Sequence, residues 1–107
     1  MQAGFGRTGK LFGYEHYEVE PDILCCGKGA SSGLPLSFVL GSQEVMDLPG
    51  IGSMSSTHSA NPLACVAGHQ NLIAMFEDNL IERSQKLGIL FHQELYDIKC
   101  KYPQYIK

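Results

Sequence analysis

The feature that most constrains the fold is a four-residue apolar run, from Ile23 to Cys26, that leads into Gly27-Lys28-Gly29. Because apolar and polar residues do not alternate in this run, it predicts a strand buried on both faces, as in α/β folds. The flanking glycines predict that the backbone leaves the strand in a conformation that bulkier residues resist. Ligands of open α/β sheets bind at the carboxyl ends of strands, which is where Lys28 would stand.

The position of Lys28 allows two interpretations. A desolvated lysine has a lowered pKa, and its neutral amine is a nucleophile. Alternatively, Lys28 is a surface residue in a loop that needs glycines only for its turn. The end of a buried strand indicates where a ligand would bind, and it leaves the chemistry open.

Length and charge limit the classes of protein to consider. With 107 residues, the chain can form one small domain with a modest core. A net charge of −3 and scattered basic residues are not typical of a nucleic-acid surface, so no nucleic-acid partner is expected. No apolar run is long enough to cross a membrane, and the first residues lack the apolar core of a signal peptide. We therefore expect no membrane association and a cytoplasmic location.

The four cysteines do not form a metal or redox motif. No pair has the CxxC spacing, so neither a zinc site nor a redox site is indicated, and no metal is expected. Cys25, Cys26 and Cys65 are expected to be small buried hydrophobic residues. A catalytic thiol at Cys25 or Cys26 is disfavoured, since no histidine lies near them in sequence.

The first half of the chain predicts a second strand and a short helix. Residues 36–40 are the second apolar run, and a glycine-rich turn at 29–35 connects it to the first. That connection is too short for a parallel crossover, so the two strands should be antiparallel if they pair. Residues 43–48 predict one or two helical turns, and residues 50–57 a polar loop.

The second half predicts two helices. Ser59 is the expected N-cap of the first helix, with Pro62 tolerated in its first turn. Residues 77–79 interrupt the helical pattern, and a second amphipathic helix should end before Pro103. The apolar residues at helical spacing in the first helix are Leu63, Val66, Ala67, Leu72, Ile73 and Phe76.

The residues between Gly4 and Lys10 match two phosphate-binding patterns. They fit GxGxxG and most of a P-loop, yet both patterns require a strand directly before and a helix directly after. Almost nothing precedes Gly4, and the stretch that follows is aromatic. The P-loop also needs Ser or Thr after its lysine, where this chain has Leu11. A nucleotide-binding module is therefore disfavoured but stays an alternative.

Hydroxyl groups precede the first long helix, in residues 55–59. The free N–H groups and the dipole of a helix N-terminus favour an anion, by roughly 0.3–1 kcal/mol for the dipole. The alternative is simple capping of the helix by Ser59, with no ligand. His58 could be a base or a metal ligand, but a lone histidine is more often a structural residue.

Four segments of distinctive sequence follow one another along the chain. They are Gln2-Ala3-Gly4-Phe5-Gly6-Arg7-Thr8-Gly9, Pro21-Asp22-Ile23 leading to Gly27-Lys28-Gly29, Gly33-Leu34-Pro35, and Thr57-His58-Ser59-Ala60-Asn61-Pro62-Leu63-Ala64-Cys65. Their order and spacing resemble the class-III pyridoxal-phosphate-dependent aminotransferases, the family of the 4-aminobutyrate, ornithine and acetylornithine enzymes. The resemblance covers essentially the whole chain. It implies that the chain is an internal fragment of a longer enzyme.

The resemblance implies an α/β fold in two parts. Residues 1–78 would be the C-terminal part of the large cofactor-binding domain, with a mostly parallel sheet, helices and one antiparallel strand. Residues 79–107 would be a linker helix and the start of the small C-terminal domain.

The resemblance also implies roles for three residues. Lys28 would form the covalent imine with the aldehyde of pyridoxal 5'-phosphate. Gln2 would approach the phenolic oxygen of the pyridine ring. Thr57 would bind the cofactor phosphate of the neighbouring subunit in a homodimer. Arg7 and Thr8 belong to the family signature, and only a structural role is expected for them.

The implied reaction moves an amino group from an amino-acid or ω-amino donor to a 2-oxo acid. Lys28, displaced by the donor amine, would then move the proton at the α- or ω-carbon. The aspartate that holds the ring nitrogen protonated in the family would lie three residues before Gln2, so the isolated chain is expected to be inactive. An alternative is a truncated, non-catalytic polypeptide that docks through its long C-terminal helix.

Overall fold

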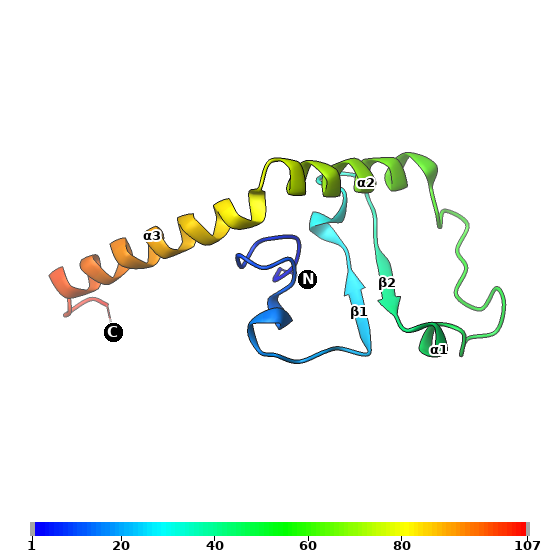
Figure 1. Cartoon of the computed structure of the whole chain (residues 1–107), viewed down its shortest axis with the longest axis horizontal. Helices are drawn as coiled ribbons and strands as arrows, with labels where there is room; N and C mark the ends of the chain where they lie inside the picture. Colours follow the sequence, from blue (N-terminus) through cyan, green and yellow to red (C-terminus); the bar gives the residue numbers. More distant parts are fainter. Residues whose placement is uncertain (1, 107) are drawn as a thin grey trace.

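The computed structural model describes residues 2–106, which form a two-stranded sheet, three α-helices and two 3-10 turns. In chain order the elements are η1 (Gly13–His16), β1 (Ile23–Cys26), η2 (Lys28–Ala30), β2 (Phe38–Gly41), α1 (Gln43–Met46), α2 (Pro62–Glu77) and α3 (Leu80–Lys101). Helix α2 lies across one end of the β1–β2 hairpin, and α3 projects away from it (Figure 1). The molecule is therefore elongated, with extents of 59 × 27 × 24 Å.

Strands β1 and β2 form an antiparallel pair, which confirms the orientation predicted from their short connection. Ile23 pairs with Gly41 at one end and Cys26 with Phe38 at the other. Strand β2 begins two residues later than predicted, at Phe38. The mostly parallel sheet stays a prediction, because the described residues hold only this antiparallel pair.

The prediction that β1 is buried on both faces is wrong for this chain. Ile23 is 52% exposed and Cys25 is exposed, while Cys26 is buried. Cys65 is exposed as well, so only one of the three cysteines expected in the core lies there. The physical reason is that the described residues cover β1 on one face, and its apolar run has no second layer to pack against.

Helix α2 begins one residue after Asn61, which caps it. The Asn61 Oδ1 atom accepts hydrogen bonds from the backbone N–H groups of Leu63, at 3.0 Å, and Ala64, at 3.3 Å. The prediction of Ser59 as the cap is wrong; its hydroxyl donates to the Ser56 carbonyl at 2.7 Å. Because Pro62 has a fixed φ that suits the first helical position, the cap falls on the residue directly before it.

The side of α2 that faces the hairpin carries small residues. Its buried residues are Ala64, Gly68 and Met75. Close approach requires the glycine, because a Cβ at position 68 would lie 3.3 Å from the Ala30 carbonyl oxygen. Large members of the predicted apolar stripe are exposed, with Leu63 at 68% and Phe76 at 56%. The predicted helix is confirmed, but its predicted stripe is only partly covered: Ala67, Leu72 and Ile73 are half-buried.

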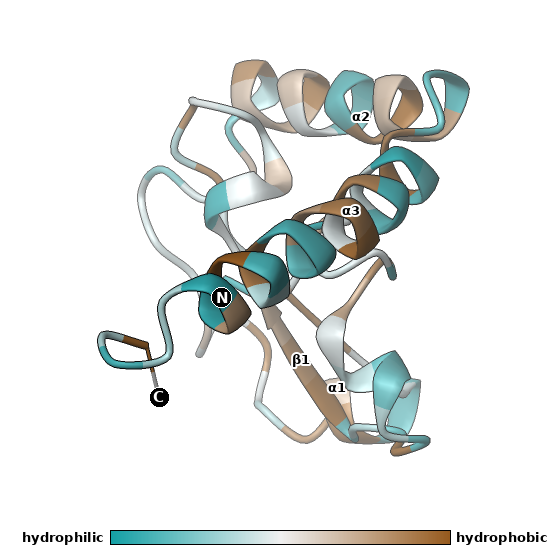
Figure 2. Cartoon of the chain, turned by 90° about the vertical axis from the view of Figure 1, so that its left-hand side faces the viewer, coloured by the Kyte–Doolittle hydropathy of each residue, from teal (hydrophilic) through white to brown (hydrophobic). Residues whose placement is uncertain are grey.

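Helices α2 and α3 are separate elements, as the interruption at residues 77–79 predicted. Asn79 adopts a left-handed conformation, with φ of 51°, and ends the run of α2. Helix α3 ends at Lys101, before Pro103 as predicted. Apolar and polar residues are interspersed along α3 in Figure 2, and none of its residues is buried. The helix therefore has an apolar surface that the described residues do not cover.

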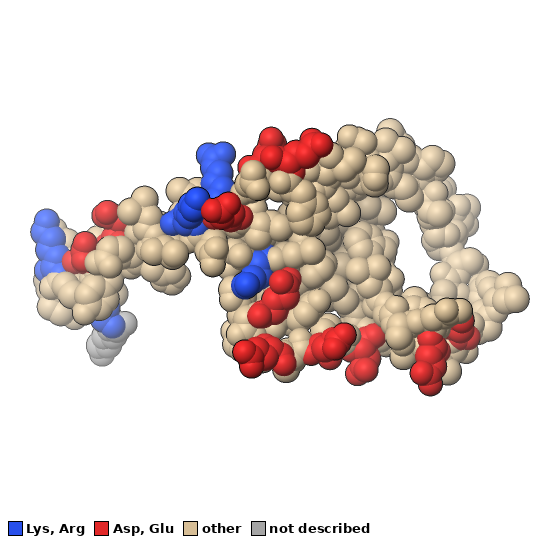
Figure 3. All heavy atoms as spheres, viewed as in Figure 1, with Lys and Arg blue, Asp and Glu red and all other residues tan. Residues whose placement is uncertain are grey.

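Charged side chains are distributed unevenly over the molecule. On the face shown in Figure 3, acidic side chains follow the lower edge, and basic side chains gather toward α3. An ion pair on α3 joins Lys86 Nζ to Glu82 Oε1 at 2.7 Å, and it lowers the pKa of the Glu82 carboxyl. Among residues 2–106, no helix has the length and apolar character that a membrane crossing requires.

Candidate active site

Lys28 lies two residues after the end of β1, behind Gly27, and adopts a left-handed backbone conformation, with φ of 47°. The glycines do not take this conformation: Gly27 is extended, with φ of −175°, and Gly29 has no positive φ. The prediction that the flanking glycines supply the unusual backbone is therefore wrong. A left-handed residue other than glycine costs roughly 1–2 kcal/mol and persists only where its surroundings hold it. Five other residues share this conformation, so the backbone alone does not single out Lys28; they are Phe5, Glu18, Ser32, Ala60 and Asn79.

Gly29 allows the opening loop to pack closely against the Lys28 turn. A Cβ at this position would lie 3.2 Å from the Cβ atom of Phe5. The Phe5 ring also makes edge-on contacts with Phe12 and Phe38, at centroid distances of 5.7 and 6.4 Å. The glycine after Lys28 thus lets the opening loop pack against the turn and against β2.

Lys28 and Gln2 line one cavity of about 430 Å³, although they are 26 positions apart in sequence. The cavity lies between the opening loop, η2, α2 and the start of α3. Its polar lining also includes Arg7, Ser32, Asn71 and Ser84. This volume falls within the range of small-molecule sites, about 300–1,000 Å³. Two of the three residues predicted for the site therefore lie together.

Thr57 lies apart from this cavity. It is exposed in the loop between α1 and α2, and it does not line the cavity that holds Lys28. Figure 1 shows this loop on the outer side of β2. Since Asn61 caps α2, the hydroxyl groups of residues 55–59 are not used for capping. Within one chain, the structure does not bring Thr57 to Lys28.

Two residues of the cavity were missed in the sequence, Asn71 and Ser32. Asn71 Nδ2 donates to the carbonyl oxygens of Gly29 and Ala30, at 2.8 and 3.2 Å. Ser32 Oγ donates to Asn71 Oδ1 at 2.5 Å. The one signal for Asn71 in the sequence is its place three positions after Gly68, which puts a polar residue on the packed face of α2. No local pattern connects it with a turn some 40 residues earlier.

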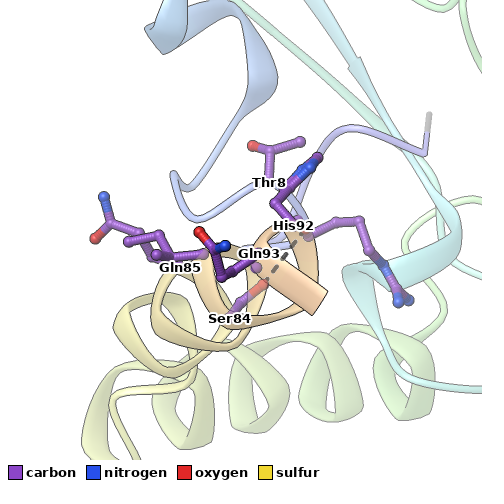
Figure 4. A pocket seen from close by; sticks show the side chains of 8 residues that line it. Thr8, Ser84, Gln85, His92 and Gln93 are labelled. Atoms are coloured by element: carbon purple, nitrogen blue, oxygen red, sulfur yellow. Dashed lines mark hydrogen bonds between the residues drawn. The ribbon is translucent and has the colours of Figure 1, made fainter. Parts of the chain in front are cut away.

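A second cavity, of about 530 Å³, is lined by the turn at Arg7 and Thr8 and by α3. Figure 4 shows Ser84 and His92 reaching it from α3 and Thr8 from the opening loop. The Ser84 hydroxyl donates to the Arg7 carbonyl at 3.4 Å. This cavity adjoins the first one but does not include Lys28.

The opening loop does not have the structure of a nucleotide-binding motif. Residues 4–10 form tight turns, and η1 is the first helical element after them. The helix that both phosphate-binding patterns require directly after the motif is absent from this described segment. Its contact with α3 agrees with the structural role expected for Arg7 and Thr8.

The buried Cys26 does not have the environment of a catalytic thiol. Burial, and then the neighbouring Cys25 thiol, raise the pKa of Cys26 above its ordinary value. A reactive cysteine needs the opposite shift, because the thiolate is the nucleophile. Among residues 2–106, no group of three His, Cys, Asp or Glu side chains could hold a metal ion. Lys28 is thus the strongest nucleophile candidate of the described site.

Comparison with known proteins connects this site with one family. The sequence model described as aminotransferase class-III matches residues 1–107. The probable 4-aminobutyrate aminotransferase of Bacillus subtilis (strain 168) is 37% identical over 103 residues, which are 96% of this chain and 24% of the relative. The chain thus spans about a quarter of the length of the curated relatives that it matches.

Solved structures give the same result. An S-selective transaminase from Arthrobacter sp. matches with a TM-score of 0.85 and 43% identity, over 92% of this chain and 22% of that one. The ornithine aminotransferase of Toxoplasma gondii, with partial occupancy of pyridoxal phosphate at its active site, matches with a TM-score of 0.84 and 41% identity, over 88% and 22%. The chain belongs to the class-III aminotransferases.

Proposed function

We propose that this chain is a segment of a pyridoxal-phosphate-dependent aminotransferase, in which Lys28 holds the cofactor. The reaction moves an amino group from an amino-acid or ω-amino donor to a 2-oxo acid. The observation that carries the proposal is the left-handed Lys28 at the end of β1, in a cavity that it shares with Gln2. Family membership supports it, because class-III aminotransferases depend on this cofactor.

The groups that line the cavity fit a phosphorylated pyridine aldehyde. Lys28 supplies an amine for the aldehyde, and the Gln2 amide can donate a hydrogen bond to the phenolic oxygen. We therefore assign Lys28 and Gln2 to cofactor binding.

The chemistry explains why a lysine is needed at this place. When bound, pyridoxal phosphate supplies a ring that accepts the electron pair left on the substrate carbon. Lys28 Nζ holds the cofactor until the donor amine replaces it. The released Nζ would then take the proton from the α- or ω-carbon of the donor and would return it to the bound cofactor.

Reduction with borohydride tests the role of Lys28 in the full-length enzyme. After loading with pyridoxal phosphate, reduction and digestion, mass spectrometry should find the cofactor on the peptide that carries Lys28. Lys28→Ala should abolish this label and lower kcat for amino transfer at least about 10²–10⁴-fold, because it removes the acid–base group. Lys10→Ala, which changes another exposed lysine, is the control and should leave both unchanged. A label fixed on any other side chain would refute the proposal.

We also propose that Thr57 acts across a homodimer, on the cofactor phosphate of the neighbouring subunit. Its place outside the Lys28 cavity of its own chain supports this assignment. Mixed dimers of one Lys28→Ala subunit and one Thr57→Ala subunit test it. Acting across the dimer, the two subunits form one site with both residues intact, which should bind pyridoxal phosphate with wild-type affinity. If Thr57 acts within its own subunit, no intact site forms and the affinity stays low.

The division of the chain into residues 1–78 and 79–107 is part of the same proposal. The left-handed Asn79 between α2 and α3 supports a boundary at this position. Limited proteolysis of the full-length enzyme should cut near residue 79 before it cuts within α2. A cytoplasmic location stays a prediction, and fractionation of cells that express the enzyme would test it.

A further inference from the structure

The turn that carries Lys28 is hydrogen-bonded from outside by the side chain of Asn71, on α2. Its Nδ2 atom donates to two successive carbonyls of the turn, Gly29 at 2.8 Å and Ala30 at 3.2 Å. These residues are 42 and 41 positions away in sequence. Asn71 thus joins the turn after β1 to a helix that arrives much later in the chain.

The turn needs such an external contact. Lys28 and Ser32 both have left-handed backbones, with φ of 47° and 56°. Neither is a glycine, so both conformations cost free energy unless surrounding groups hold them. Within the turn, the Ala30 N–H donates to the Gly27 carbonyl at 3.2 Å. Asn71 adds bonds to the two carbonyls directly after Lys28, where that internal bond does not act.

The Asn71 amide is itself oriented. Ser32 Oγ donates to its Oδ1 atom at 2.5 Å, while Nδ2 faces the carbonyls, so both ends of the amide have partners. Gly68, one turn earlier in α2, allows the helix to approach Ala30 closely enough for these bonds. Asn71 also lines the cavity that contains Lys28. An oriented amide on a rigid helix can fix the turn better than a loop residue could.

We propose that Asn71 is a positioning residue for Lys28. By fixing the carbonyls of Gly29 and Ala30, it holds the left-handed turn and so keeps Nζ where it can attach the cofactor and move the substrate proton. The inference rests on the proposed function of Lys28. Asn71 acts through the turn and is not assigned any contact with substrate.

Asn71→Leu in the full-length enzyme tests this role, because leucine has nearly the same volume and no donor. The matched control is Gln70→Ala, on the adjacent exposed position, whose side chain makes no hydrogen bond within the described residues. In the cofactor-free protein, hydrogen exchange of the backbone amides of residues 28–31 should become about tenfold faster in Asn71→Leu. It should not change in Gln70→Ala.

A second readout measures the amine itself. The rate at which added pyridoxal phosphate becomes attached to Lys28, followed by absorbance and borohydride fixation, should fall about tenfold in Asn71→Leu, since small displacements of a reacting group have large effects. With 4-aminobutyrate as the probe donor, kcat should fall by a similar factor while KM stays within about twofold. If Asn71→Leu does not accumulate as folded protein, Asn71→Ser replaces it, because its shorter hydroxyl cannot reach both carbonyls.

The two proposals fail in different ways. Exchange at residues 28–31 that matches the Gln70→Ala control would overturn the inference about Asn71. Faster exchange with unchanged attachment and kcat would overturn it too, because the contact would then be structural only. Cofactor fixed on another residue in the wild-type enzyme would refute the function proposed for Lys28, whatever the exchange result.

Discussion

At the scale of single residues, Gly9 determines how closely the opening loop approaches α3. It is buried and has a φ of 81°, in the left-handed region. A Cβ at this position would lie 2.8 Å from the Cβ atom of Gln85 and 3.0 Å from its Cα atom. Because one of these atoms is helix backbone, a side-chain rotation cannot relieve the contact. The loop that carries Gln2 therefore depends on this glycine for its position.

Gly9→Ala should destabilise the full-length enzyme by about 2–5 kcal/mol. Backbone strain contributes roughly 1–2 kcal/mol and crowding against α3 roughly 1–3 kcal/mol. Thermal unfolding should show a midpoint several degrees lower, since about 1 kcal/mol corresponds to roughly 2–4 °C in a domain of 150–250 residues. Lys10→Ala, at the next and exposed position, is the control. Equal midpoints for the two variants would contradict this account of the loop.

Individual site residues could be predicted from the sequence to different degrees. Lys28 was predicted as a site residue because an apolar run precedes it and glycines flank it, and the structure places it in a cavity. Its left-handed backbone was assigned to the wrong residues, because glycine usually takes that conformation. The role of Gln2 in cofactor binding was predicted only from the resemblance to the family. Asn71 was missed because its partners are about 40 residues away, and only the tertiary structure brings them together.

At the scale of elements, α2 follows the loop that holds Thr57 and contacts the turn that carries Lys28. The start of this helix therefore affects the position of both segments. Asn61 caps this helix through two bonds from backbone N–H groups, and Pro62 supplies the first helical residue. The cap therefore fixes where the polar loop ends and the helix begins.

Asn61→Ala should cost about 1 kcal/mol, with a range of roughly 0.5–2 kcal/mol, because two N–H groups lose their acceptor. The thermal midpoint of the full-length enzyme measures this loss. Ser59→Ala is the matched control, since Ser59 bonds only to Ser56 within the loop, and it should change stability by less than about 0.5 kcal/mol. If Ser59→Ala lowered the stability more than Asn61→Ala, Ser59 would be the N-cap, as the sequence predicted.

The boundaries of the elements were easier to predict than their buried faces. Residues that begin or end a helix act on their immediate neighbours. Pro62 is the first residue of α2, and α3 ends shortly before Pro103. The side of α2 that packs is not local information. Periodicity predicts an apolar stripe, but Ala64 and Gly68 face the hairpin because only small residues allow that approach. Met75 is buried farther along the helix, while Leu63 and Phe76 stay exposed.

At the scale of the whole molecule, the chain exposes far more surface than its size requires. A compact monomer of 11.7 kDa exposes about 5,900 Å², whereas this chain exposes 8797 Å². Its radius of gyration is 18.3 Å, against about 13 Å for a compact domain of this length. The buried apolar residues among those described are Cys26, Ala30, Ala64 and Met75. Such a small core cannot offset the conformational entropy of ordering the chain.

The 107-residue chain on its own should therefore not unfold in one cooperative step. Circular dichroism at 222 nm should decline gradually on heating, because a helix such as α3 is marginal without tertiary packing. A dye that fluoresces on exposed apolar surface should bind to the isolated chain and not to the full-length enzyme. The same segment inside the full-length enzyme is the control, and its amides should exchange slowly there. A single sharp transition from a monomeric chain would contradict this expectation, because it would show that four buried residues suffice to hold the turn of Lys28 in place.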